Sequence, residues 1–327
     1  MALLATILVI PTTSANANPT WLAYFAGTTK PTVSKNTESV QNKNLSNPTI
    51  AILDGALDTS IPIIKDRLIY EACVTQWSTC PNDMAETEGP GSSTIKPEWL
   101  AKNGFDHGTQ MASLAIATNP NINIVFVRIV GTNPTLGLRQ ATGEATVYNA
   151  LDWVIRNKDR FNIQAVSMSQ GQSTSRNPDP NYCPTTPITE GKINTLAAAG
   201  VPVFFPTGNS RSYTKIDWPA CIPASIAIGA TMPAETIAIY SNYDPLLTDF
   251  FALGNTRATS VGGKVVNVAG TSASTVIAAT QWATIKAAKP TLTYTEIYDL
   301  ISRTAKPTFN SKVPSGKLID LQKALNG

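Results

Sequence analysis

Three side chains suited to be an acid, a base and a nucleophile are spread along the chain, in the order Asp54, His107 and Ser272. His107 is the only histidine among 327 residues. This excludes a zinc site built on several imidazoles, and it makes His107 the natural general base near neutral pH. A serine hydroxyl becomes a nucleophile when such a base takes its proton.

The residues after His107 predict that it stands at the start of a helix. Gly108 allows a close approach of its backbone to a neighbouring segment, and Thr109 can cap the start of a helix. Residues 111–117 are an apolar run typical of a helix. A lone histidine is most often an ordinary surface or core residue. The helix-terminal position is what marks His107 as a candidate.

Ser272 stands near the start of another predicted helix, at residues 271–288. N–H groups at a helix start can hold a developing oxyanion, although a serine there can also be only a cap. An α/β-hydrolase needs a histidine after its nucleophile and a Gly-x-Ser-x-Gly turn, and Ser272 has neither. The chymotrypsin order His-Asp-Ser stays open on residue types, but that fold is all β.

Five blocks of the sequence resemble the subtilases, the subtilisin-like serine endopeptidases, in the family's order. They are AILDGALD at 51–58, HGTQMA at 107–112, SMSQG at 167–171, AGVPVFFPTGN at 199–209 and GTSAS at 270–274. The resemblance extends from about residue 48 to residue 325.

The resemblance implies a role for each matching position. Ser272 would attack the peptide carbonyl, His107 would carry the proton, and Asp54 would orient the imidazole. Asn209 would donate its side-chain amide to the oxyanion, and Thr271 would add a weaker hydroxyl contact.

The same resemblance implies how substrate binds. The backbone of Ser169, Gln170 and Gly171 would pair with an extended protein or peptide as an edge strand. The pocket for the residue before the scissile bond would be lined by Pro206, Thr207 and Gly208. No cofactor is needed for this chemistry, no metal ligands are assigned, and a structural calcium is not located. We expect a monomer.

Several positions depart from the family pattern. Gly55 follows the acid where Ser or Thr is usual, Gln110 stands where a second histidine is common, and Val276 replaces a proline. The run Gly-Thr-Ser-Ala-Ser also resembles the sedolisins, which have Glu for the histidine and Asp for the oxyanion asparagine. Because this chain has His107 and Asn209 at those positions, its sequence argues against membership of the sedolisins.

Strands alternate with helices from residue 48 onward. Strands are predicted at 48–53, 122–130, 163–169, 201–205 and 225–229, and helices at 144–158, 190–199, 271–288, 294–304 and 318–325. Residues 70–104 are predicted as a loop. The alternation predicts an α/β fold, a doubly wound and mostly parallel sheet with helices on both faces. Asp54 would follow the first strand, at the edge where such sheets place function.

The composition and the N-terminus indicate an exported protein. The net charge is +3, and charged residues make up 14% against a usual value of about 25%. With no basic run, nucleic acid and anionic membrane are poor partners. Residues 1–17 predict a signal peptide, with an N-terminal strand as the alternative, and residues 18–47 an arm or linker. We expect residues 48–327 to form a subtilisin-like peptidase domain and the protein to be secreted.

Four cysteines, Cys73, Cys80, Cys183 and Cys221, allow three disulfide connectivities. We expect Cys73–Cys80 and Cys183–Cys221. The alternative, a metal site, lacks C-x-x-C spacing and further histidines.

Two other functions remain beside a secreted serine endopeptidase that works through an acyl-enzyme. The changed positions after Ser272 would suit a catalytically impaired subtilase-like protein that binds peptides. An α/β esterase unrelated to peptidases would keep its activity when His107 is replaced by Ala.

Overall fold

The computed structural model describes residues 46–327 except 77–78, 103, 134–137, 141, 175–176, 178, 180–181 and 185. The described residues all belong to one unit, Val40–Gly327. The predicted signal peptide at 1–17 lies outside the described residues, and so does the arm at 18–47 apart from its last two residues. Among the helices described, none has the length and apolar character needed to cross a membrane.

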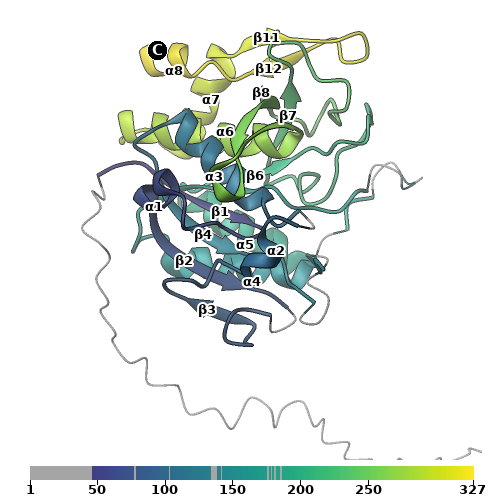
Figure 1. The fold of residues 1–327 in the computed structure, drawn as a ribbon. Helices are drawn as coiled ribbons and strands as arrows, with labels where there is room; N and C mark the ends of the chain where they lie inside the picture. Colours follow the sequence, from purple (N-terminus) through teal and green to yellow (C-terminus); the bar gives the residue numbers. More distant parts are fainter. Residues whose placement is uncertain are drawn as a thin grey trace, which may run out of the picture. The chain divides into compact units, whose positions relative to one another are not determined.

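A ten-stranded sheet forms the centre of the described structure, in the order β11-β12-β8-β7-β6-β5-β1-β4-β2-β3 (Figure 1). The strands from β12 to β2 are parallel, and β11 and β3 add an antiparallel strand at either edge. The sheet strands are β1 Thr49–Asp54, β2 Leu68–Val74, β3 Glu86–Glu88, β4 Asn123–Arg128, β5 Ile163–Met168, β6 Val203–Pro206, β7 Ile226–Thr231, β8 Phe250–Leu253, β11 Lys306–Thr308 and β12 Gly316–Leu318. A separate antiparallel hairpin consists of β9 Asn255–Thr259 and β10 Val265–Ala269.

Helices cover both faces of this sheet. They are α1 Pro62–Arg67, α2 Pro97–Leu100, α3 His107–Thr118, α4 Glu144–Asn157, α5 Pro187–Ala198, α6 Thr271–Ala288, α7 Tyr294–Thr304 and α8 Leu321–Asn326, with a short 3-10 turn at Val261–Gly263. One core contains Trp153 of α4 and Leu196 of α5, and the other contains Met111 of α3 and Trp282 of α6. The predicted doubly wound α/β fold is therefore confirmed.

The central strand β1 is buried along its whole length. Ala51 and Leu53 belong to one core and Ile50 and Ile52 to the other, as the two-residue period of a strand requires. After β1 the chain forms β2 and β3 at one edge of the sheet, returns to form β4 between β1 and β2, and then places β5 on the other side of β1. Ligands bind at such a reversal of strand order, at the carboxyl ends of the strands, and Asp54 stands at that end of β1.

Helix α6 is the buried helix that its apolar sequence predicts. It packs on β5, β6, β7 and α3, and most of its residues are buried. Its N-terminus lies at the carboxyl edge of the sheet, because Ser169 after β5 and Asn209 after β6 both hydrogen-bond to its first residues. The fold thus brings three distant segments together at one edge.

Two local predictions were wrong. Residues 70–104 are not all loop, because most of β2, the strand β3 and the helix α2 fall within them. Strand β2 reads Leu-Ile-Tyr-Glu-Ala-Cys-Val, and pairing with β4 outweighs its lack of clean alternation. Thr109 does not cap α3, because the helix already begins at His107. The Thr109 hydroxyl instead accepts a hydrogen bond from the Asp58 N–H at 2.9 Å.

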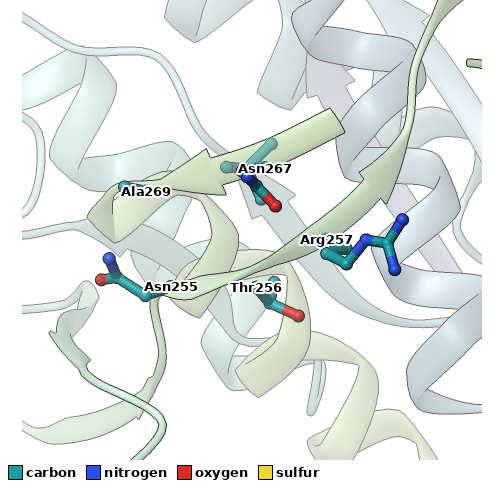
Figure 2. Close-up of a pocket in the computed structure, with 6 residues that line it drawn as sticks. Asn255, Thr256, Arg257, Asn267 and Ala269 are labelled. Atoms are coloured by element: carbon teal, nitrogen blue, oxygen red, sulfur yellow. The ribbon is translucent and has the colours of Figure 1, made fainter. Parts of the chain in front are cut away.

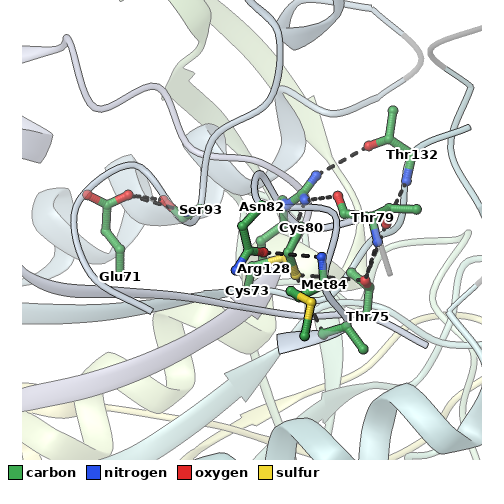
Figure 3. Close-up of a disulfide and its surroundings, with 11 residues drawn as sticks. Glu71, Cys73, Thr75, Thr79, Cys80, Asn82, Met84, Ser93, Arg128 and Thr132 are labelled. Atoms are coloured by element: carbon green, nitrogen blue, oxygen red, sulfur yellow. Dashed lines mark hydrogen bonds between the residues drawn. A yellow bond between two sulfur atoms is a disulfide. The ribbon is translucent and has the colours of Figure 1, made fainter. Parts of the chain in front are cut away.

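Both predicted disulfides, Cys73–Cys80 and Cys183–Cys221, are present. Figure 3 shows Cys73–Cys80 beside Arg128, whose guanidinium donates to Cys73 Sγ at 3.2 Å and to the Thr132 hydroxyl at 3.2 Å. Burial lowers the pKa of Arg128 to about 10. The bridge ties the end of β2 to the loop that follows it.

Candidate active site

The Asp54 carboxylate and the His107 ring form a hydrogen-bonded pair. Asp54 Oδ1 lies 2.8 Å from His107 Nδ1, and the two side chains are 0% and 25% exposed. Asp54 Oδ1 also accepts from the Gly55 N–H at 2.6 Å. A carboxylate in this position selects the imidazole tautomer with a proton on Nδ1, which leaves Nε2 free to accept a proton.

Close packing at the start of α3 sets the place of His107. A Cβ on Gly108 would lie 2.6 Å from the Ala56 carbonyl oxygen and 2.7 Å from Phe126 Cζ, so only glycine fits there. The N-cap residue Asp106 is itself held, since Gln110 Nε2 and Ser260 Oγ donate to its Oδ2 at 2.8 and 3.0 Å. Gln110, which replaces the family's common second histidine, thus supports the cap.

The pair shifts the pKa of both partners toward their charged forms. Burial acts to raise the pKa of Asp54, but the neighbouring His107, the Gly55 N–H and the more distant Arg139 together hold it below its ordinary value. Burial acts to lower the pKa of His107. The Asp54 carboxylate outweighs that effect, Arg139 opposes Asp54 and Asp106 reinforces it, so the pKa of His107 is raised.

Ser272 is the second residue of α6, and it forms hydrogen bonds with Ser169. The Ser272 hydroxyl donates to the Ser169 carbonyl at 3.5 Å, and the Ser169 hydroxyl donates to the Ser272 carbonyl at 3.1 Å. Within the described residues no hydrogen bond joins Ser272 to His107. The 3.5 Å contact is at the limit of a hydrogen bond, so the hydroxyl can leave it at little cost.

Asn209 is oriented by the first residue of α6. Its Oδ1 accepts from the Thr271 N–H at 2.9 Å and from the Thr271 hydroxyl at 3.0 Å. The amide nitrogen is therefore turned away from the helix, and it makes no hydrogen bond with any other described residue. The buried Thr271 hydroxyl donates its one proton to Asn209 Oδ1, so Thr271 orients the Asn209 amide.

The segment after β5 combines a backbone edge with one inward side chain. Gln172 forms a two-bond antiparallel bridge with Trp218, and a Cβ on Gly171 would overlap the Trp218 carbonyl oxygen. The side chain of Gln170 turns toward the acid, where its Nε2 donates to Asp54 Oδ1 at 2.9 Å. Arg139 donates to Gln170 Oε1 at 2.6 Å.

The predicted pocket segment, Pro206–Gly208, begins with the last residue of β6 and contacts Asp217. The Thr207 carbonyl accepts from the Asp217 N–H at 2.8 Å. Gly208 has a φ of +106°, and a Cβ there would overlap the Asp217 carboxylate and the Asn242 amide. The side chain of Asn242 accepts from two N–H groups of the loop after Asn209, at 2.9 and 3.0 Å.

Ser272 lines neither of two cavities found among the described residues. One, of about 310 Å³, follows the hairpin β9–β10, where Figure 2 shows Asn255, Arg257 and Asn267 along it. The other, of about 450 Å³, borders the Cys73–Cys80 disulfide and includes Trp99 and Arg128. Neither contains a residue predicted to act in catalysis. In the part of the chain that the structure describes, no cluster of three or more His, Cys, Asp and Glu could hold a metal ion.

The sequence missed several residues that shape this site. The side chains of Gln170 and Arg139 contact each other, Gln170 contacts the acid, and Asp217 and Asn242 adjoin Gly208. Only the SMSQG block pointed toward Gln170, and it did so for its backbone. Arg139, Asp217 and Asn242 lie outside the five sequence blocks that resemble the family, so nothing in the sequence pointed to them.

The site contains the kinds of group that acyl transfer to a serine would use. The tautomer of His107 is set by a buried carboxylate, Ser272 stands at the start of α6, and Thr271 orients the Asn209 amide at the same helix start.

Comparison with known proteins gives one consistent result. Residues 46–318 match the Subtilase family. Subtilisin NAT of Bacillus subtilis subsp. natto is 25% identical over 287 residues, which cover 85% of this chain and 66% of that protein. The chain thus spans just under two thirds of that relative. Subtilisin of Bacillus pumilus is 25% identical over 287 residues, covering 85% and 91%.

Solved structures share the fold. The self-cleaved protease domain of PatA has a TM-score of 0.64 at 17% identity, and the match covers 85% of this chain and 95% of that one. At this level of identity the likeness concerns the fold alone.

Proposed function

Since this chain belongs to the subtilase family, we propose that it is a serine endopeptidase that cleaves protein or peptide substrates through an acyl-enzyme. Ser272 is the nucleophile, His107 the general base and acid, and Asp54 the residue that orients the imidazole. The observation that carries the proposal is the buried Asp54 carboxylate 2.8 Å from Nδ1 of the chain's only histidine.

The first half of the reaction acylates the serine. The Ser272 hydroxyl turns from the Ser169 carbonyl toward His107, and its oxygen attacks the carbonyl carbon of the peptide bond while Nε2 takes the proton. The tetrahedral oxyanion accepts hydrogen bonds from the Asn209 amide and from the Ser272 N–H. Collapse breaks the C–N bond, and the imidazolium gives its proton to the departing amine.

The second half repeats these steps with water. His107 takes a proton from the water molecule that attacks the acyl carbon, and it returns the proton to Ser272 as the acid product leaves. Asp54 keeps its charge throughout and stabilises each imidazolium. The oxyanion donors need no rearrangement, since Thr271 already holds the Asn209 side chain.

Substrate binds as an extended strand along the Ser169–Gly171 backbone, with the residue before the scissile bond toward Pro206–Gly208. The exposed Gly171 supports this, since it presents backbone without a side chain. Secretion is part of the proposal, and it is supported by the two disulfides, which persist in oxidising compartments.

An active-site fluorophosphonate probe tests the nucleophile. We expect the folded protein to be labelled, Ser272→Ala to remain unlabelled, and His107→Ala to lose labelling and casein hydrolysis. Replacing the base should lower kcat by about 10⁶-fold, a size established for subtilisin itself and carried over here.

Ser274→Ala is the matched control, because this neighbouring serine on α6 is buried and its hydroxyl has no hydrogen-bond partner. It should be labelled like the wild type. A correctly folded wild-type protein that neither reacts with the probe nor cleaves casein would refute the proposal and favour peptide binding without turnover. Hydrolysis that survives His107→Ala would instead favour an esterase of another type.

A further inference from the structure

The side chain of Gln170 joins a cation to the carboxylate of the acid–base pair. Its Nε2 donates to Asp54 Oδ1 at 2.9 Å and lies 3.4 Å from His107 Nδ1. Its Oε1 accepts from Arg139 at 2.6 Å. Asp54 and Arg139 lie 116 and 31 positions from Gln170 along the chain, so the link exists only in the folded protein.

Asp54 has few other donors. The Gly55 N–H and His107 Nδ1 contact Oδ1, and Oδ2 is buried without a hydrogen-bond partner. Gly55 has no side chain with which to add one. Among the described residues, the Gln170 amide is therefore the one side-chain donor to this carboxylate besides the imidazole. Losing one donor to a buried charge has a large effect on its orientation and its charge.

Arg139 is exposed at the rim of the site and is anchored at two points. Besides Gln170, its guanidinium donates to the Gly104 carbonyl at 3.4 Å. Within the described residues no carboxylate lies within ion-pair distance of it. Its charge acts on the acid–base pair, where it favours ionised Asp54 and disfavours protonated His107.

We propose that Gln170 and Arg139 are positioning residues, a relay in which the Gln170 amide shares the Asp54 carboxylate with His107 and keeps the positive charge of Arg139 beside the pair. The charge of Arg139 opposes the two carboxylates that favour protonated His107, Asp54 of β1 and Asp106 at the N-cap of α3. As a result, a larger fraction of His107 is neutral, and able to act as a base, at a given pH. This catalytic consequence rests on the proposed function, whereas the effect on ionisation does not.

The single histidine makes the relay directly measurable. In protein carrying ¹⁵N-labelled histidine, NMR shows the two ring nitrogens of a single imidazole, and their titration reports His107 alone. Arg139→Gln should raise the pKa of His107, because a repelling charge is lost. Gln170→Leu should also raise it, because Asp54 loses a donor and Arg139 its anchor. Arg139→Lys keeps the charge and should recover most of the wild-type value.

Two controls bracket the measurement. Asp106→Asn should lower the pKa of His107, since a negative charge near the ring is removed. Arg303→Gln, an exposed arginine on α7 that is not among the electrostatic partners of His107, should leave it unchanged. In the double variant of Arg139 and Gln170 the shifts should be less than additive, because one residue acts through the other.

Kinetic measurements distinguish an effect on the pKa of His107 from a purely structural role of Gln170 and Arg139. The acid limb of the kcat/KM profile should move up in pH with the NMR value, whereas a structural defect would lower the plateau and leave the limb in place. An unchanged His107 titration in both Arg139→Gln and Gln170→Leu, or fully additive shifts, would overturn the relay. A wild-type protein inert toward the fluorophosphonate probe would refute only the proposed function, because the titration needs no turnover.

Discussion

Replacing Gly108 by alanine should damage stability and catalysis together. The added Cβ would lie 2.6 Å from the Ala56 carbonyl oxygen and 2.7 Å from Phe126 Cζ, where ordinary contacts begin near 3.4 Å. Backbone and a ring in the core must therefore each yield by several tenths of an ångström. Overpacking of this kind costs about 1–3 kcal/mol. At about 2–4 °C per kcal/mol, the midpoint of thermal unfolding should fall by several degrees.

The catalytic loss should exceed what stability alone explains. Gly108 follows His107, and Ala56 lies two residues after Asp54, so any widening between Gly108 and Ala56 separates the acid from the base. Misplacement by about 1 Å can cost about 10²-fold in rate. We therefore expect kcat/KM to fall by about 10- to 100-fold at temperatures where the variant stays folded.

Gly191→Ala is the matched control for Gly108→Ala. Gly191 is also a helical glycine, in α5, but apart from its chain neighbours and the backbone of its own helix no atom lies within 4 Å of the position of its Cβ. Alanine there should stabilise the protein by about 0.5–1 kcal/mol and leave kcat/KM unchanged. The assays are urea and thermal unfolding together with hydrolysis of a peptide substrate. A Gly108→Ala protein as stable and active as the wild type would show that the contact does not constrain the site.

Further predictions concern the oxyanion donor, the base and one disulfide. Asn209→Ala should lower kcat by about 10²–10³-fold with little change in unfolding, a magnitude taken over from subtilisin. The kcat/KM profile should fall as the pH drops through a midpoint above 6.5, because the catalytic form of His107 is neutral and its pKa is raised; a midpoint below 6.5 would contradict this. Replacing Cys183 and Cys221 by Ala should cost about 4 kcal/mol in urea unfolding, since the bridge spans 38 residues; no loss would argue that the unfolded chain is not constrained by it.

Much of the architecture could be predicted because it follows from the local pattern of apolar and polar residues. The buried run ending at Asp54, the apolar helix 271–288 and the alternation between them specify strand, helix and fold class. The identities of Asp54, His107 and Ser272 came from residue type, order and resemblance. The strand β2 was missed because its pairing with β4, and not its own pattern, makes it a strand.

The sequence alone determined which chemical groups this protein has and which local structures carry them. Tertiary structure alone decided that β1 lies between β4 and β5, that Thr271 orients Asn209, and that Gln170 joins Arg139 to the acid. Strand β5 ends at Met168, and with it ends the alternation of side chains between the two faces of the sheet. The sequence pattern therefore does not predict the direction of the Gln170 side chain. Contacts between residues far apart along the chain depend on strand order and register, which only the packed sheet determines.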